Sequence, residues 1–158
     1  MDVLIDALTM RDVVVGLRPV PRSIEVDISN YLITLHEYLF LLEVATEEML
    51  ETSAPSEIRE VDDLLDRVLG ARDWCAFNLD VEMINDIYGT SVEIISPSAS
   101  RLRHVTAVQD YYRLDVRDAL NLLAAEEREV PFLVQSGLVN RAVEDAFADR
   151  GVPILMAA

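Results

Sequence analysis

Three acidic residues, far apart in the sequence, each follow or begin a segment where a strand is expected to give way to a helix. Asp6 ends the apolar run of residues 3–5, and Glu37 lies just past the apolar run of residues 31–35. Asp118 stands near the start of an apolar helix. Carboxylates are preferred ligands of Mg²⁺ and Mn²⁺, and Mg²⁺ usually takes one or two of them together with water and substrate phosphate. This pattern predicts a divalent-cation site at Asp6, Glu37 and Asp118.

Each of the three acids also has a structural explanation. The helix dipole favours an acid such as Asp118 near a helix N-terminus by about 0.3–1 kcal/mol, although Asp115 competes for that role. Glu37 falls on an apolar helix face, where an unpaired carboxylate is costly, so a metal ion or an arginine must compensate it. Asp6 could simply end a strand at the surface. Both interpretations stay open for each acid.

The segments that must position these acids alternate between strands and helices. Strands are expected at residues 3–6, 23–28, 74–79, 130–134 and 152–156, and residues 91–95 are expected to form a strand or a helix end. Helices are expected at residues 9–15, 32–51, 81–88, 99–111, 116–127 and 138–148, and from an N-cap at Ser56 to a stop at Gly70. This alternation favours an α/β fold with a mainly parallel sheet, which binds ligands at the carboxyl ends of its strands. Without a repeat or linker, residues 1–158 are expected to form one domain.

The charge composition limits how the protein can bind nucleic acid. Its net charge is −16, and all 13 basic residues are arginine. This composition suits a high-salt cytoplasm, where charge is screened within about 3 Å at molar salt, or else it reflects the codon usage of GC-rich DNA. A strong general attraction to nucleic acid is therefore not expected, and any contact with RNA must be local. The basic cluster Arg101-Leu102-Arg103-His104 is either such a contact or a solvated helix face.

Neither export nor membrane insertion is expected from the sequence. No apolar run reaches the roughly 18 residues that a membrane helix needs. The N-terminus has acidic residues where a signal peptide would have basic ones, so we expect a cytoplasmic protein. The single cysteine, Cys75, cannot form an internal disulfide, and its expected role is that of a small buried apolar residue.

The order and spacing of these segments resemble the PIN domain, the nuclease fold of many toxin–antitoxin toxins and RNA-processing enzymes. Residues 1–6 (Met-Asp-Val-Leu-Ile-Asp) are similar to the first strand of the family and its terminal aspartate. Ile33-Thr34-Leu35-His36-Glu37 resembles the second motif, and Arg117-Asp118-Ala119-Leu120 resembles the third. Residues 130–134 and 151–155 resemble the fourth and closing strands.

The sequence departs from the family pattern at two places. Ala7 and Leu8 stand where the family usually has a small polar residue and asparagine. Gln135-Ser136-Gly137 stands where it usually has Thr-x-Asp, so the fourth ligand position is neutral, with Ser136 as its candidate.

The resemblance implies a three-layer α/β/α fold and a metal-dependent ribonuclease that uses Mg²⁺ or Mn²⁺. Asp6 and Asp118 would then be direct or water-mediated metal ligands, and Glu37 would orient a metal-bound water or act as its general base. The resemblance also implies an RNA substrate, an antitoxin-like protein partner and a homodimer. Two alternatives are a PIN-like domain that has lost hydrolysis and serves as a binding module, and an unrelated α/β domain whose three acids lie far apart.

Overall fold

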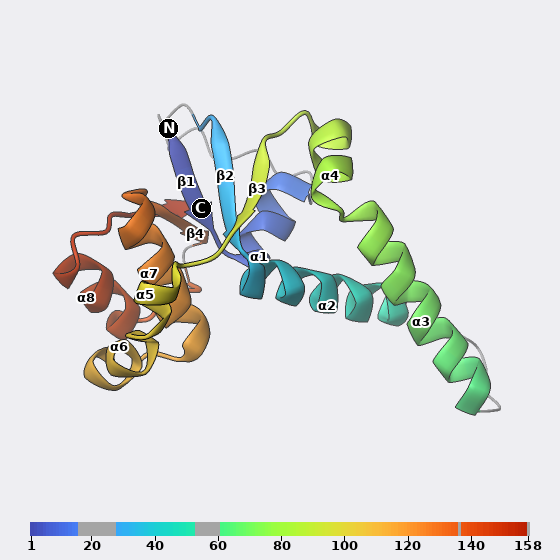
Figure 1. Cartoon of the computed structure of the whole chain (residues 1–158). Helices are drawn as coiled ribbons and strands as arrows, with labels where there is room; N and C mark the ends of the chain where they lie inside the picture. Colours follow the sequence, from blue (N-terminus) through green and yellow to red (C-terminus); the bar gives the residue numbers. More distant parts are fainter. Residues whose placement is uncertain (16–27, 53–60, 136, 158) are drawn as a thin grey trace.

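A computed structural model describes residues 1–15, 28–52, 61–135 and 137–157, which form a three-layer α/β/α fold (Figure 1). At its centre is a five-stranded sheet in the spatial order β3-β2-β1-β4-β5, and all four strand pairs are parallel. The strands are β1 (Asp2–Ile5), β2 (Asn30–Thr34), β3 (Val92–Ile95), β4 (Phe132–Gln135) and β5 (Ile154–Ala157). The predicted fold class is confirmed.

Helices cover both faces of the sheet. One face packs against α6 (Val105–Tyr112), α7 (Val116–Arg128) and α8 (Arg141–Asp149), and the short α5 (Ala99–Leu102) lies beside α7. The other face packs against α1 (Ala7–Thr9), the π-helix η1 (Met10–Val15), α2 (Leu35–Thr52), α3 (Val61–Asn78) and α4 (Val81–Tyr88). In Figure 1, α2 and α3 extend side by side away from the sheet.

The apolar runs of the strands explain why both faces are covered. Successive side chains of a strand point to opposite faces, so a continuous apolar run buries both. In β1, Leu4 faces the core under α7 and α8, whereas Val3 and Ile5 face the core under α1, α2 and α4. Phe132 stacks on Phe147 of α8 with ring centroids 5.1 Å apart, which ties β4 to its helical layer.

The strand order places a topological switch point at the carboxyl end of the sheet, between the neighbouring strands β1 and β4. The chain proceeds from β1 through β2 to β3 in one direction, then returns to place β4 on the other side of β1. The connections after β1 and β4 therefore leave on opposite faces of the sheet. Parallel sheets bind ligands outside the carboxyl ends of their strands, at the point where the strand order reverses in this way. Asp6 directly follows β1.

Several predicted elements are confirmed with small shifts in their ends. Residues 9–15 are helical, as α1 and η1, and residues 91–95 contain β3. The helix at residues 81–88 is α4, and Gly89 ends it in the left-handed conformation at φ 62°. Cys75 is buried, as expected.

The predicted start of the helix at residue 32 is wrong, because residues 30–34 form β2 and α2 begins at Leu35. A short run that is apolar on all sides fits a doubly buried strand as well as a buried helix, so periodicity could not separate the two.

The predicted stop at Gly70 and strand at residues 74–79 are wrong, because α3 continues from Val61 to Asn78. Ala71, Cys75 and Leu79 are buried at a spacing of four residues, which is the period of a helix and not of a strand. One glycine inside a helix costs only about 1 kcal/mol relative to alanine, so it did not end this one.

The helix predicted at residues 99–111 is divided into α5 and α6. The N–H of His104 donates to the carbonyl of Arg101 in a tight turn that closes α5. The strand predicted at residues 23–28 and the cap at Ser56 lie outside the described residues, apart from Ile28, which is not in a strand. No helix within the described ranges is long and apolar enough to cross a membrane.

Two glycine substitutions should change stability in opposite directions. Gly70→Ala should raise the free energy of unfolding by about 0.5–1 kcal/mol, because Gly70 lies inside α3 and an added Cβ has no atom within 4 Å. Gly89→Ala should lower it by about 1 kcal/mol, because an L side chain is strained at φ 62°. Urea unfolding of both variants would check this, and destabilisation by Gly70→Ala would contradict the continuous helix.

Candidate functional site

Asp6 occupies the junction between β1 and α1, where it is almost wholly buried. Its side chain is 6% exposed, and its Oδ1 atom has no hydrogen-bond partner among the described residues. Asp6 holds the N-cap position of α1 without making a side-chain cap hydrogen bond. Burial raises the pKa of this carboxyl from 3.8 to about 6, with a contribution from the nearby Glu37 charge, while Thr9 and Arg117 oppose the rise. A buried acceptor without a donor from the protein is satisfied by a proton, a water molecule or a cation.

Glu37 is 1% exposed, and its carboxylate accepts four hydrogen bonds. Arg117 donates from Nε to Oε1 at 2.9 Å and from Nη2 to Oε2 at 3.1 Å. The backbone N–H of Ala7 donates to Oε2 at 2.8 Å, and Asn121 Nδ2 donates to Oε1 at 3.2 Å. The compensation that the sequence required for this buried acid is therefore supplied by an arginine and two neutral donors.

The start of α2 directs the Glu37 carboxylate toward Arg117 of α7 and the N–H of Ala7, at the carboxyl end of the sheet. Thr34 and Glu37 have the spacing of a capping box, in which the glutamate would reach back to the threonine N–H. Half of the box forms, since the N–H of Glu37 donates to Thr34 Oγ1 at 3.2 Å. The carboxylate turns instead toward Arg117 and Ala7. Thr34 in turn donates to Asn121 Oδ1 at 3.4 Å, which fixes the amide that faces Glu37.

Asp118 lies in the first turn of α7, and Asp115 caps that helix. The side chain of Asp115 accepts from the N–H of Asp118 at 2.8 Å, so the expected competition for the cap is resolved in favour of Asp115. The Asp118 carboxyl is free of the capping role. Burial and the charge of Asp115 raise its pKa from 3.8 to about 6, against the attraction of Arg117.

The three predicted acids line one cleft of about 220 Å³ at the carboxyl ends of β1 and β4. Asp115, Arg117, Asn121 and Asn140 add its other polar groups, and apolar side chains including Leu8, Leu138 and Val143 form its walls. Within the described parts of the chain, no group of three or more His, Cys, Asp or Glu side chains could hold a metal ion. Asp6 and Asp118 together still match the one or two carboxylates by which Mg²⁺ is commonly held.

Arg117 is the residue of the cleft whose role sequence reasoning missed. In the sequence it stands out only as the neighbour of Asp118 in the third motif. The requirement that a metal ion or an arginine compensate Glu37 was the available signal, but sequence alone could not choose among 13 arginines.

The neutral fourth position belongs to a different hydrogen-bond network. Gln135 ends β4, and its N–H donates to Thr9 Oγ1 at 2.9 Å. Its side-chain amide donates to Asp12 Oδ2 at 2.8 Å, which joins it to η1. Ser136 lies outside the described residues.

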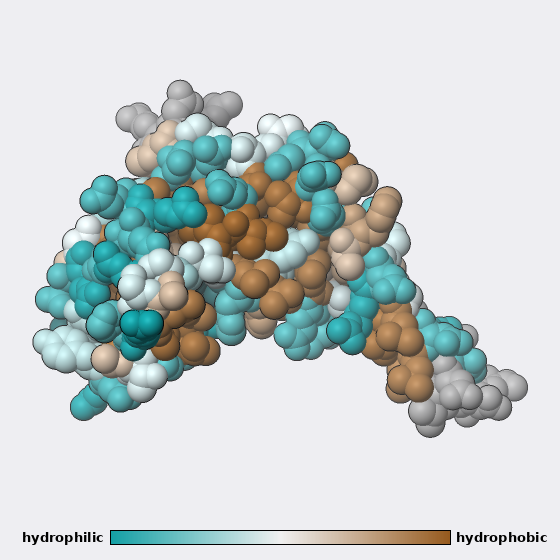
Figure 2. All heavy atoms as spheres, viewed as in Figure 1, coloured by the Kyte–Doolittle hydropathy of each residue, from teal (hydrophilic) through white to brown (hydrophobic). Residues whose placement is uncertain are grey.

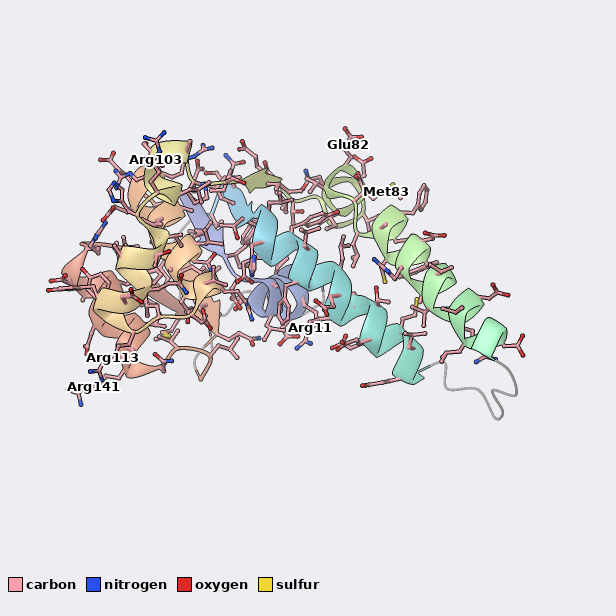
Figure 3. The ribbon with its side chains drawn as sticks, turned by 60° about the horizontal axis from the view of Figure 1, so that its bottom comes forward. Arg11, Glu82, Met83, Arg103, Arg113 and Arg141 are labelled. Atoms are coloured by element: carbon pink, nitrogen blue, oxygen red, sulfur yellow. The ribbon has the colours of Figure 1, made fainter. Side chains whose placement is uncertain are left out.

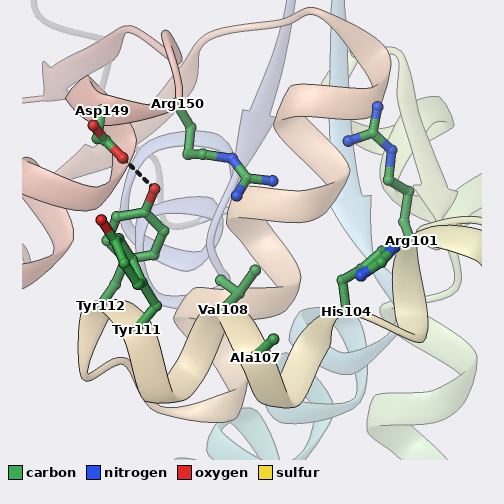
Figure 4. A pocket seen from close by; sticks show the side chains of 8 residues that line it. All are labelled: Arg101, His104, Ala107, Val108, Tyr111, Tyr112, Asp149 and Arg150. Carbon is green, nitrogen blue, oxygen red and sulfur yellow. Dashed lines mark hydrogen bonds between the residues drawn. The ribbon is translucent and has the colours of Figure 1, made fainter.

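A larger hollow, of about 690 Å³, lies between α6 and the end of α8, away from the three acids (Figure 4). It is lined in part by Arg101, His104, Tyr111 and Arg150. Arg150 pairs with Glu126, and Arg101 pairs with both Glu126 and Glu127, so two carboxylates face the two arginines. The predicted basic cluster is therefore partly an internal ion-pair network, and this hollow is a weaker candidate than the acidic cleft.

Other arginines lie at the outer side of the same helices. Figure 3 shows Arg103, Arg113 and Arg141 there, apart from Arg11, which lies beside α2. Each of the three is exposed.

No protein-family model matches this sequence, and no curated protein matches it.

The stability of the metal-free protein should fall as Asp6 ionises. The unfolded chain loses this proton near pH 3.8 and the folded protein near pH 6, so the folded state binds more protons between these values. The free energy of unfolding should therefore decrease across that window by up to about 3 kcal/mol from this group.

Asp6→Asn removes the titrating carboxyl. The free energy of unfolding of this variant, minus that of wild type, should therefore increase as the pH rises from 4 to 7. Urea unfolding in EDTA would measure the difference at each pH. Asp110→Asn, at an exposed position of α6, is the control. A difference between Asp6→Asn and wild type that stays constant with pH would contradict the buried-carboxyl account.

Proposed function

We propose that this protein is a PIN-type ribonuclease that depends on a divalent metal ion. The convergence of Asp6 and Asp118 in one cleft at the sheet reversal is the observation that supports it most. Asp6 has a buried oxygen without a donor among the described residues, and the pKa values of Asp6 and Asp118 are both raised to about 6. Both features are expected of a pair of carboxylates that binds a cation and is here without one. The sequence resemblance adds the ribonuclease class.

The side chains of the cleft divide into groups that bind and groups that orient. Asp6 and Asp118 would hold Mg²⁺ or Mn²⁺. When bound, such an ion supplies an activated water and stabilises the charge that builds on a phosphate. Glu37 holds Arg117 and the turn after β1 through its four hydrogen bonds. A role for Glu37 as general base requires that Arg117 first release one of its oxygens.

A second candidate is a PIN-like domain that binds RNA or protein without hydrolysis. The bidentate pairing of Glu37 with Arg117 and the engagement of Gln135 with Asp12 favour it, because they leave two carboxylates to hold an ion. The two candidates differ in whether the cleft cleaves RNA.

Mn²⁺ binding to wild type and Asp118→Asn tests the metal site, and RNA cleavage by the same proteins separates the candidates. By calorimetry in high salt, wild type should bind Mn²⁺, and the variant should bind it about tenfold more weakly or worse, since losing a direct ion–carboxylate contact costs at least about 1.4 kcal/mol. Ribonuclease activity should fall with it, while Asp118→Asn should be no less stable because a like charge beside Asp115 is removed.

Asp110→Asn is the matched control for this experiment and should leave Mn²⁺ affinity and activity unchanged. Equal Mn²⁺ binding by wild type and Asp118→Asn would exclude Asp118 from the site. Metal binding without RNA cleavage would favour the binding module.

The proposal includes a homodimer, for which α3 offers the surface. Figure 2 shows apolar side chains exposed along this helix. Leu65, Leu69 and Phe77 are more than half exposed, and exposed apolar patches commonly mark protein interfaces. An antitoxin-like partner would use the same apolar chemistry.

Leu69→Glu should convert a dimer to the 17.7 kDa monomer, because it places a charge within the apolar face. Light scattering after gel filtration measures the mass of wild type and variant. Leu102→Glu, an exposed leucine of α5 on the other side of the sheet, should leave the dimer intact. A monomeric wild type at all accessible concentrations would remove the homodimer from the proposal.

A further inference from the structure

The Arg117 guanidinium is fixed in the cleft from two sides. Glu37 holds its Nε and Nη2 atoms, at 2.9 and 3.1 Å. The ring of Phe40 lies beneath it, with Cζ 4.0 Å from the ring centroid. Its side chain is 31% exposed and lines the cleft with Asp6 and Asp118. Its orientation is therefore set before any ligand arrives.

These contacts leave part of the guanidinium available. An arginine has five N–H donors, and Glu37 accepts from two of them. The other three have no hydrogen-bond acceptor among the described residues. Because the group also lines the cleft, these donors are positioned for a ligand that carries acceptor oxygens.

The same contacts limit how many metal ions the cleft can hold. Hydrolysis of a phosphodiester by two ions needs enough carboxylates to bind both, one beside the attacking oxygen and one beside the leaving oxygen. Glu37 is occupied by Arg117, and Gln135 is neutral and bound to Asp12. Asp115 also lines the cleft but caps α7, so Asp6 and Asp118 remain, which is enough for one Mg²⁺ or Mn²⁺.

We infer that Arg117 takes the place of a second cation by binding a non-bridging oxygen of the substrate phosphodiester. This inference rests on the proposed function and specifies its mechanism as one ion plus one arginine. Guanidinium matches the geometry of phosphate oxygens, and its charge is permanent, so it stabilises the same negative charge that a second ion would. Glu37 is then a positioning residue that aims Arg117.

The RNA-binding test uses a variant without the two proposed metal-binding carboxylates, so that neither metal binding nor hydrolysis affects the result. In Asp6→Asn/Asp118→Asn, binding of a fluorescently labelled single-stranded RNA of mixed sequence is measured by anisotropy in EDTA, which separates binding from hydrolysis. Adding Glu37→Gln should preserve RNA binding, because the glutamine amide oxygen can still accept from Arg117 and hold it toward the cleft, while no carboxylate charge opposes it. Adding both Glu37→Gln and Arg117→Gln should weaken it about tenfold or more, the size expected for losing a hydrogen bond to a charged group.

Two controls separate phosphate binding from a structural role. Removing both charges of the pair avoids an uncompensated Glu37, so loss of folding does not decide the result. Arg72→Gln, at an exposed arginine of α3 that does not line the cleft, should leave RNA binding unchanged. Glu37→Gln/Arg117→Lys should recover part of the lost affinity, because lysine keeps the charge without the fork.

Metal stoichiometry gives an independent readout. Calorimetry should show one Mn²⁺ per wild-type chain, and still one for Glu37→Gln/Arg117→Gln. Two ions per wild-type chain, or unchanged RNA affinity in the Glu37→Gln/Arg117→Gln variant, would overturn the inference while leaving a metal-dependent nuclease in place. Absence of Mn²⁺ binding by wild type would overturn the proposed function, and RNA binding that still depends on Arg117 would then assign it to a phosphate-binding module.

Discussion

The buried carboxylate of Glu37 is the constraint on which the rest of this structure depends. An ionised glutamate at 1% exposure is costly unless every lone pair is matched, and removing one partner of such a pair typically costs several kcal/mol. Its donors are the N–H of Ala7, just after β1, and the side chains of Arg117 and Asn121 on α7. Asn121 also accepts from Thr34 at the end of β2. The same four hydrogen bonds therefore join the sheet to both helical layers at the edge where the cleft opens.

This constraint also explains the contrast between the acids of the cleft. Glu37 has donors for both oxygens, whereas Asp6 has a buried oxygen with none among the described residues. Asp115 caps α7 in place of Asp118, and its negative charge raises the pKa of the Asp118 carboxyl. The cleft thus contains one carboxylate with donors for both oxygens and two carboxyls whose pKa values are raised, and this contrast is what supports the proposed cation site.

The sequence predicted the carboxyl end of β1 to within one residue, but it missed β2 and the continuity of α3. Asp6 was placed correctly because a run that buries both faces of a strand ends sharply at a charged residue. The path of α3 through Gly70 was missed because its burial pattern depends on packing against α2, and the apolar spacing of Ala71 and Cys75 overrides a single glycine. Arg117 was missed for a related reason: its partner Glu37 is 80 residues away, and pairing at that distance is set by topology.

The overall charge of −16 makes the local cations of the cleft decisive for any RNA substrate. Molar salt screens charge beyond about 3 Å, which removes long-range repulsion but leaves direct contacts intact. Within that range a phosphodiester entering the cleft meets Asp6, Asp118 and Asp115 as well as Arg117. Arg117 is already shared with Glu37, so it alone cannot neutralise the other acids. Under the proposed function, RNA binding by the native cleft should therefore be coupled to metal binding, because a cation held by Asp6 and Asp118 would replace their repulsion of the phosphate with a second point of attraction.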